Sequence, residues 1–254
     1  MQPDPLLLAG LRPCVAVVPA YNEAAAIGQV VAQALAQRIV GWPVFDRVVV
    51  VDNASSDGTA DRARDAGARV VHQSERGYGV ACLTGIAVVP HARCLVFVDG
   101  DASVDLTQTA ELLAPLLAGA DLVIGARHNP PPDAMGFPQR FGNWLASALI
   151  RLLWHVAVTD LGPFRAVRAD ALQRIAMRDR RFGWTVEMQV RAIQENLQMV
   201  EVPVRLLPRV GCSKISGTVR GVVGAAVGIF GTIGRLWWAG QRRALRRRRR
   251  STQG

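Results

Sequence analysis

The chain has 254 residues, half of them hydrophobic, which is enough for the core of one large α/β domain or of a domain with an appendage. Its formal net charge of +10 is uneven, because seven arginines lie within residues 242–250. Outside that segment 23 basic residues face 20 acidic ones, and no basic stripe with interleaved aromatics is present. This distribution argues against a nucleic acid as partner.

The cysteines and histidines show no pattern of metal ligands. The four cysteines are scattered without a CxxC pair, and the four histidines have no ligand spacing. Residues 1–14 lack the basic start of a secretory signal. We therefore expect free thiols, a cytoplasmic location and no zinc site.

Apolar runs and helical stretches alternate through the first half of the chain. We predict strands over 14–18 (stopped by Pro19), 47–51, 69–72, 94–98 and 122–125. The intervening helices are predicted over 23–38 with Asn22 as N-cap, from the loop before 59 to 66 with Gly67 closing it, from 79 to 89, and over 105–117. This alternation predicts an α/β fold, with a central and mostly parallel sheet flanked by helices.

The rhythm breaks after residue 127. A proline-rich loop over 128–133 leads to a predicted apolar helix over 141–156 and a turn over 160–165. A helix over 184–196, an extended segment over 199–207 and a polar loop over 209–214 are predicted to follow.

The C-terminal segment is apolar, then strongly basic. Its apolar part, 222–234, is shorter than the ~20 residues that span a bilayer. Trp237, Trp238 and the arginines favour an amphipathic helix lying on an anionic leaflet. The alternative is a helix docked on the body, with a solvated basic end. We therefore divide the chain into a leader (1–13), one domain (14–217) and a membrane-associating helix with a basic tail (218–254).

Acidic side chains follow the central predicted strands. Asp99 and Asp101 come directly after the run 94–98, separated by Gly100, and Asp52 follows the run 47–51. Parallel strands present their carboxyl ends at one edge of the sheet, where ligands of open α/β sheets bind. Two carboxylates there suit Mg²⁺ or Mn²⁺ bridging to a diphosphate, although a solvated turn is the simpler alternative for the pair alone. The sequence lacks both GxGxxG after the first strand and GxxxxGK[ST], which argues against a dinucleotide site and a P-loop.

Seven motifs in order resemble family 2 inverting glycosyltransferases, most nearly the polyprenyl-phosphate (dolichyl-phosphate) mannose and glucose synthases. They cover about residues 14–217 and are VPAYNE (18–23), DNASSDGT (52–59), RGYG (76–79), DGD (99–101), GPFR (162–165), GWTVEM (183–188) and RVGCSK (209–214). The resemblance implies a GT-A fold and a nucleotide-sugar donor.

The resemblance also implies roles for individual residues. The nucleoside pocket would be lined by Pro19, Ala20, Tyr21 and Glu23, with Asp52 on the base or ribose and Asn53, Arg76, Gly100 and Ser213 also on the donor side. Asp99 and Asp101 would form the metal-binding DxD element, with Ser103 as a third ligand that is poorer than Gln. Arg209, Ser213 and Lys214 match a loop, RxxGxSK, that closes over the phosphates.

The implied reaction is attack on the anomeric carbon opposite the diphosphate. The metal and Lys214 would stabilise the charge that develops on the leaving group. A lipid phosphate is already anionic and needs no strong base, whereas a hydroxyl acceptor needs a carboxylate, for which Glu187 and Asp160 are candidates. Glu187 could equally pair with Arg191 one helical turn on. We expect Arg127 and Arg165 on the acceptor side.

We therefore expect a metal-dependent hexosyltransferase that uses a UDP- or GDP-sugar and a polyprenyl phosphate, peripheral on the cytoplasmic face of the membrane. One alternative is the same transfer to a hydroxyl of a lipid or small metabolite. Another is a non-catalytic protein that binds nucleotide sugars or acts as a membrane scaffold. The sequence has no QxxRW motif and no long transmembrane pair, which argues against a processive polysaccharide synthase.

Overall fold

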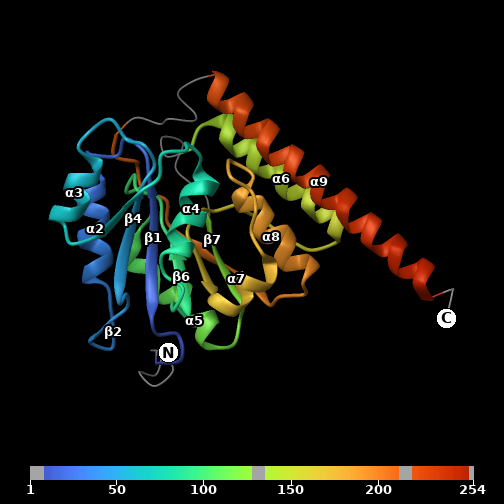
Figure 1. The fold of residues 1–254 in the computed structure, drawn as a ribbon, viewed down its shortest axis with the longest axis horizontal. Helices are drawn as coiled ribbons and strands as arrows, with labels where there is room; N and C mark the ends of the chain where they lie inside the picture. The colour runs from blue at the N-terminus through green and yellow to red at the C-terminus, as the bar shows by residue number, and fades with distance from the viewer. Residues whose placement is uncertain (1–8, 128–134, 212–218, 252–254) are drawn as a thin grey trace.

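The computed structural model describes residues 9–127, 135–211 and 219–251, and in the last segment it describes only the backbone of 219–223, 225 and 243–251. A seven-stranded sheet in the order β5-β4-β1-β6-β8-β7-β9 lies between layers of helices (Figure 1). Its strands are β1 (Cys14–Ala20), β4 (Arg47–Asp52), β5 (Arg69–His72), β6 (Cys94–Phe97), β7 (Leu122–Arg127), β8 (Arg165–Arg168) and β9 (Met199–Val204). A separate hairpin joins β2 (Arg38–Ile39) to β3 (Trp42–Pro43).

The helices occupy the connections between these strands. They are α2 (Ile27–Ala36), α3 (Thr59–Asp65), α4 (Tyr78–Ala87), a 3₁₀ turn η1 (Leu106–Gln108) that continues into α5 (Thr109–Leu117), α6 (Phe137–Trp154), α7 (Ala169–Ile175), α8 (Trp184–Gln194) and α9 (Val219–Ser251). Helices α2, α3 and α5 pack on one face of the sheet, and α4, α7 and α8 pack on the other.

The sheet is mostly parallel, as predicted. Strands β5, β4, β1 and β6 pair in parallel, and so do β7 and β9. Among the described strands of this sheet, only β8 is antiparallel to its neighbours β6 and β7. Its Ala166 lies between Val96 of β6 and Val123 of β7. Strand β8 and helix α7 were not predicted, because the sequence pattern after residue 127 no longer alternates.

The strands read as continuous apolar runs because both faces of the sheet are covered. All seven residues of β1 are buried, and successive side chains point to opposite clusters: Ala16 and Val18 to one, Val15 and Val17 to the other. Trp184 of α8 lies edge-on to Phe97 with ring centroids 4.7 Å apart. This packing fixes α8 against β6, the strand that precedes Asp99.

Two predicted boundaries are wrong for physical reasons. Pro19 does not stop β1, because β1 pairs with β4 as far as Ala20. The pairing of β1 with β6 already ends at Val17, so the N–H that Pro19 lacks is not needed for the hydrogen bonds between β1 and β6. Asn22 is not an N-cap, since α2 begins only at Ile27. Asn22 has a left-handed backbone (φ 53°), and its side chain accepts the N–H of Ser56 at 2.8 Å.

A third cluster joins α6, α8 and α9 beside the sheet. Ile233 and Leu236 of α9 are buried against Ile150 of α6 and Val190 of α8. Figure 1 shows α9 running alongside α6 and then projecting past the body towards the C-terminus. This part of α9 is therefore docked, which was the alternative to membrane contact. Among the described helices, none combines the length and hydropathy that crossing a bilayer requires.

The approach of α4 to the sheet yields a stability prediction. A Cβ at Gly85 would overlap the Cγ1 methyl of Val17, whose side chain is buried and β-branched. Gly85→Ala should lower the free energy of unfolding by about 1–3 kcal/mol. The control Gly142→Ala, inside α6 with nothing near its Cβ, should raise it by roughly 0.5–1 kcal/mol. Urea unfolding measures both, and equal effects would contradict the close packing of α4.

Candidate functional site

The carboxyl ends of β1, β4 and β6 converge on a pocket of about 370 Å³. Its lining residues are Pro19, Ala20, Tyr21, Glu23, Asn53, Arg76, Gly77, Tyr78, Ala81, Asp99, Gly100, Asp101, Arg181, Phe182 and Arg209. The structure therefore brings together most of the residues predicted for the donor side. Ser213 and Lys214 lie outside the described residues. We refer to this cavity as the rim pocket.

Asp52 lies beneath the rim pocket and does not line it. Its side chain is 7% exposed, with one oxygen 3.1 Å from Nδ1 of His72 and the other accepting the N–H of Ser55. The predicted contact with the base or ribose therefore stays a prediction. What the structure shows is a carboxylate that ties the end of β4 to the neighbouring β5 and to the following loop.

Asn53 holds one wall of the rim pocket in place. Its side-chain amide donates to the carbonyls of Gln73 and Glu75, at 3.2 and 2.5 Å, and its oxygen accepts the N–H of Gly77 at 2.7 Å. These bonds fix the loop that carries Arg76. The guanidinium of Arg76 stacks over the ring of Tyr21 at 4.6 Å from its centroid. The result is a flat, cationic wall.

The segment 178–182 also borders the rim pocket, where it packs against the loop that carries Arg76, and this contact was not predicted. Gly79 and Val80 donate their N–H groups to the carbonyls of Arg181 and Arg180, at 3.2 and 3.0 Å. A Cβ at Gly79 would collide with the backbone of this segment, so the glycine permits the contact. The RGYG motif was the one sequence signal for it, since it marks a close approach at the start of α4.

Glu187 anchors that segment from below. It is 1% exposed; one oxygen bonds Nε of Arg191 at 2.9 Å and the other accepts the N–H groups of Arg178 and Asp179 at 2.8 and 2.5 Å. The predicted pairing of Glu187 with Arg191 is confirmed. The geometry does not support the alternative role as a base, because both oxygens are occupied and the side chain does not line the rim pocket.

Asp99 and Asp101 are the acidic centre of the rim pocket. The hydroxyl of Tyr78 donates to Oδ1 of Asp99 at 3.1 Å, and Oδ1 of Asp101 accepts the N–H and hydroxyl of Ser103 at 3.0 and 2.6 Å. Burial, and then the charge of Asp101, raise the pKa of Asp99 to about 7. Ionisation of Asp99 is therefore unfavourable at this site in the free protein. Ser103, predicted as a metal ligand, directs its hydroxyl to Asp101 in this structure.

Arg209 bridges the acidic centre to the first strand end. Its Nη2 lies 3.0 Å from Oε1 of Glu23 and 3.2 Å from Oδ2 of Asp101. Its Nε is buried and has no hydrogen-bond partner among the described residues. The carbonyl of Asp101 accepts the N–H of Val210 at 2.9 Å, so backbone as well as side chain holds this loop over the DxD element.

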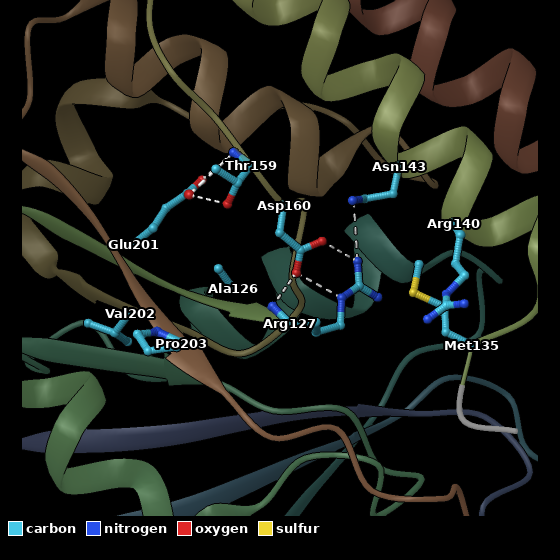
Figure 2. Close-up of a pocket in the computed structure, with 10 residues that line it drawn as sticks. All are labelled: Ala126, Arg127, Met135, Arg140, Asn143, Thr159, Asp160, Glu201, Val202 and Pro203. Carbon is cyan, nitrogen blue, oxygen red and sulfur yellow. Dashed lines mark hydrogen bonds and ion pairs between the residues drawn. The ribbon is translucent and has the colours of Figure 1, made fainter. Parts of the chain in front are cut away.

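A larger pocket of about 710 Å³ opens beside the end of β7 (Figure 2). It is lined by Ala126, Arg127, Met135, Arg140, Asn143, Thr159, Asp160, Glu201, Val202 and Pro203. We refer to it as the β7 pocket. Figure 2 shows Asn143 and Arg140 reaching it from α6, and Arg127 and Asp160 facing each other at its centre.

Arg127 and Asp160 form a two-pronged ion pair. Nε and Nη2 of Arg127 lie 2.8 and 2.6 Å from the two oxygens of Asp160, and Nη2 also lies 3.3 Å from Oδ1 of Asn143. Burial disfavours the charge of Arg127, but the hydrogen bonds and charge of Asp160 outweigh it and raise the pKa of Arg127. Both oxygens of Asp160 are therefore engaged, which does not favour its predicted role as a base.

Arg165 does not line either pocket. It is 0% exposed, and its Nε and Nη1 donate to the carbonyls of Gly162 and Thr185 at 2.7 and 2.6 Å. Burial lowers its pKa to about 10. The prediction that Arg165 contacts the acceptor is not supported, because its donors are spent on the backbone inside the protein.

Comparison with known proteins identifies a family. The model of glycosyl transferase family 2 matches residues 15–176. An uncharacterized glycosyltransferase of Mycobacterium tuberculosis is 35% identical, over 82% of this chain and 91% of the relative. An undecaprenyl-phosphate mannosyltransferase of Micrococcus luteus is 33% identical, over 83% and 89%. A polyprenol monophosphomannose synthase of Mycolicibacterium smegmatis is 29% identical, over 85% of each chain.

Solved structures support the fold. Glucosyl-3-phosphoglycerate synthase of Mycobacterium tuberculosis, in complex with Mn²⁺, uridine diphosphate and phosphoglyceric acid, superposes with a TM-score of 0.75. The match covers 91% of this chain and 80% of that one, at 21% identity. The predicted GT-A fold is confirmed by this likeness, which at such identity concerns the fold alone.

The raised pKa of Asp99 predicts a pH-dependent stability. Between an unfolded pKa near 4 and the folded value of about 7, the folded state holds more protons, so stability from this group falls as pH rises and levels off above pH 7. Asp99→Asn removes the cost and still offers Tyr78 an acceptor. Its advantage over the wild type should grow by about 2–3 kcal/mol between pH 5 and pH 8.

Urea unfolding without divalent cations measures this difference. The control Asp61→Asn, whose partner Arg64 and whose own side chain are exposed, should show almost no change with pH. An advantage of Asp99→Asn that is the same at both pH values would show that the carboxyl titrates normally.

Proposed function

The chain belongs to glycosyl transferase family 2, and on that basis we propose that it transfers a hexose from a UDP- or GDP-sugar to a polyprenyl phosphate, with a divalent cation, at the cytoplasmic face of the membrane. One observation carries the proposal: Asp99 and Asp101 line the same pocket as the stacked Tyr21 and Arg76 and the loop bearing Arg209.

The residues of the rim pocket fit a nucleoside diphosphate with its cation. Tyr21 and Arg76 offer a surface on which a base can stack, and the two aspartates supply hard oxygen ligands. The described residues contain no group of three acidic, histidine or cysteine side chains around one point. Asp99 and Asp101 would therefore hold Mg²⁺ or Mn²⁺ together with substrate phosphate and water, as Mg²⁺ sites commonly do.

Bound there, the cation would stabilise the negative charge of the departing diphosphate. Arg209 would contribute from the protein, since its guanidinium lies next to Asp101 and presents an unpartnered Nε among the described residues. Lys214 is proposed to act with it, on the basis of the RxxGxSK resemblance.

The β7 pocket suits the acceptor phosphate. Arg127 is partly buried, is held by Asp160 and lines this pocket, and Arg140 reaches it from α6. Neither carboxylate considered as a base is available, because Asp160 is bonded to Arg127 and Glu187 to Arg191 and the backbone. An acceptor that is already anionic needs no strong base. This favours a lipid phosphate over a hydroxyl, as do the names of two relatives.

Asp101→Asn should abolish cation-dependent donor binding. Calorimetry with UDP- and GDP-sugars, with and without Mn²⁺, should show binding that needs the cation in the wild type and weakens at least about 100-fold in the variant. Asp61→Asn, on the exposed face of α3, is the control. Donor binding that ignores both Mn²⁺ and the substitution would refute the role of the aspartates.

A screen of donors against acceptors, with membranes added and product read by mass, tests the transfer itself. We expect product only with a polyprenyl phosphate. Product with a small hydroxyl acceptor instead would assign the β7 pocket to the alternative reaction.

Arg209→Gln tests whether the guanidinium of Arg209 neutralises Asp101 in the absence of a divalent cation. In the free protein its guanidinium partly neutralises Asp101, so its removal should tighten Mn²⁺ binding without nucleotide by about tenfold. The same variant should weaken binding of UDP in the presence of Mn²⁺. Electron paramagnetic resonance of free Mn²⁺ measures the first effect. Arg205→Gln, from the same loop and paired with Asp105, should change neither affinity.

A further inference from the structure

Helix α6 exposes a row of large apolar side chains. Phe137, Phe141, Trp144 and Leu152 are 79, 50, 62 and 67% exposed. They follow at intervals of four, three and eight residues, which places them on one face of the helix. The three aromatic rings lie next to one another along the helix, with centroids 6.3 Å apart between Phe137 and Phe141 and 5.8 Å apart between Phe141 and Trp144. We call these four residues the aromatic stripe.

The stripe lies opposite the face that α6 buries. Ala146 and Ile150 pack against α8 and α9 in the third cluster, so the stripe is not needed to attach α6 to the body. Contiguous apolar surface of this kind is uncommon on a soluble monomer and indicates an interaction site. Phenylalanine and tryptophan together are typical of the headgroup level of a bilayer.

The charge around the stripe selects the partner. Arg140 and Arg151 are exposed on α6 and lie, by helical angle, beside the stripe. The sequences of α6 and α9 contain two and nine arginines and no acidic residue. The two helices pack side by side (Figure 1), and Val227 and Trp238 are exposed on α9.

An anionic lipid surface complements this composition. A second copy of the chain would bring arginines against arginines, which like-charge repulsion disfavours. A bilayer with anionic headgroups accepts both the apolar side chains and the cations, each basic residue near the surface adding about 1 kcal/mol.

The stripe also adjoins the β7 pocket. That pocket is lined by Met135, just before α6, and by Arg140 and Asn143 in the first two turns of α6, where the stripe begins. A phosphate held by Arg127 would therefore be bound near the lipid-facing end of the helix. This step rests on the proposed function of the pocket.

We propose that the aromatic stripe, with Arg140 and Arg151, docks the protein on an anionic bilayer and keeps the β7 pocket at the interface. The arginine tail strengthens the attachment, and α6 gives it orientation.

Co-sedimentation with vesicles tests the proposal. The full chain should bind vesicles that contain about 30% phosphatidylglycerol more tightly than vesicles of phosphatidylcholine alone. Phe141→Ser combined with Trp144→Ser should weaken that binding at least about tenfold, because two large apolar side chains no longer enter the bilayer. Trp42→Ser is the matched control: Trp42 is 58% exposed in strand β3 of the separate hairpin, outside α6 and α9. It should bind like the wild type.

Folding and the donor site are checked separately. Both variants should keep the wild-type thermal midpoint and the wild-type affinity for UDP with Mn²⁺. Vesicle binding that survives the double substitution, or that Trp42→Ser reduces equally, overturns the proposal. The wild type could also fail to bind vesicles and instead form a concentration-dependent dimer or bind duplex DNA. If the double variant then loses that dimer or that DNA binding, the proposal is overturned, and the stripe is an interface for a second copy or for DNA.

The test separates this inference from the proposed function. If the stripe binds vesicles but no polyprenyl phosphate accepts a sugar, the docking surface stands and the acceptor is wrong. If transfer to a polyprenyl phosphate in detergent is normal in the double variant and vesicle binding was never present, the function stands and the docking surface is wrong.

Discussion

The structure depends on two carboxylates placed at the buried end of β6. Burial and mutual repulsion make Asp99 and Asp101 unfavourable neighbours, as the raised pKa of Asp99 shows. The groups that offset this cost come from distant parts of the chain: the hydroxyl of Tyr78 at the start of α4, and the guanidiniums of Arg127 at the end of β7 and of Arg209 after β9. Under the proposed function, a cation bound there would relieve the repulsion.

Several polar residues act on the pockets through the backbone they hold. Asn53 fixes the loop of Arg76, and Glu187 fixes the segment that carries Arg181. Asp160 likewise holds Arg127 in a single orientation. Buried and hydrogen-bonded, these side chains hold the walls of the two pockets in a preformed arrangement.

Helix α6 connects the chemistry to the surface. One side of it packs on α8 and α9, its first turns contribute Arg140 and Asn143 to the β7 pocket, and its outer side carries the aromatic stripe. This helix thus joins the β7 pocket to the exposed aromatic stripe. Helix α9 packs against α6 and runs alongside it (Figure 1).

The sequence by itself determined the parallel core and the acidic rim. Apolar runs such as 47–51 and 94–98 are long enough to be buried on both faces, and parallel pairing alone then puts Asp52, Asp99 and Asp101 at one edge. The free thiols of Cys14, Cys82 and Cys94 were predicted too, and all three are buried.

Only the tertiary structure decided which polar residues face a pocket. From the motifs alone, Glu187, Asp160 and Arg165 were all candidates for contact with substrate. Their actual partners lie up to 33 residues away in the sequence and are set by packing. Strand β8 escaped prediction for the same reason, since its antiparallel place between β6 and β7 follows from long-range pairing. A local sequence pattern determines the periodicity of apolar residues and the positions of charged ones. The burial of a polar side chain and the identity of its partner depend on contacts between segments remote in sequence, which no local pattern contains.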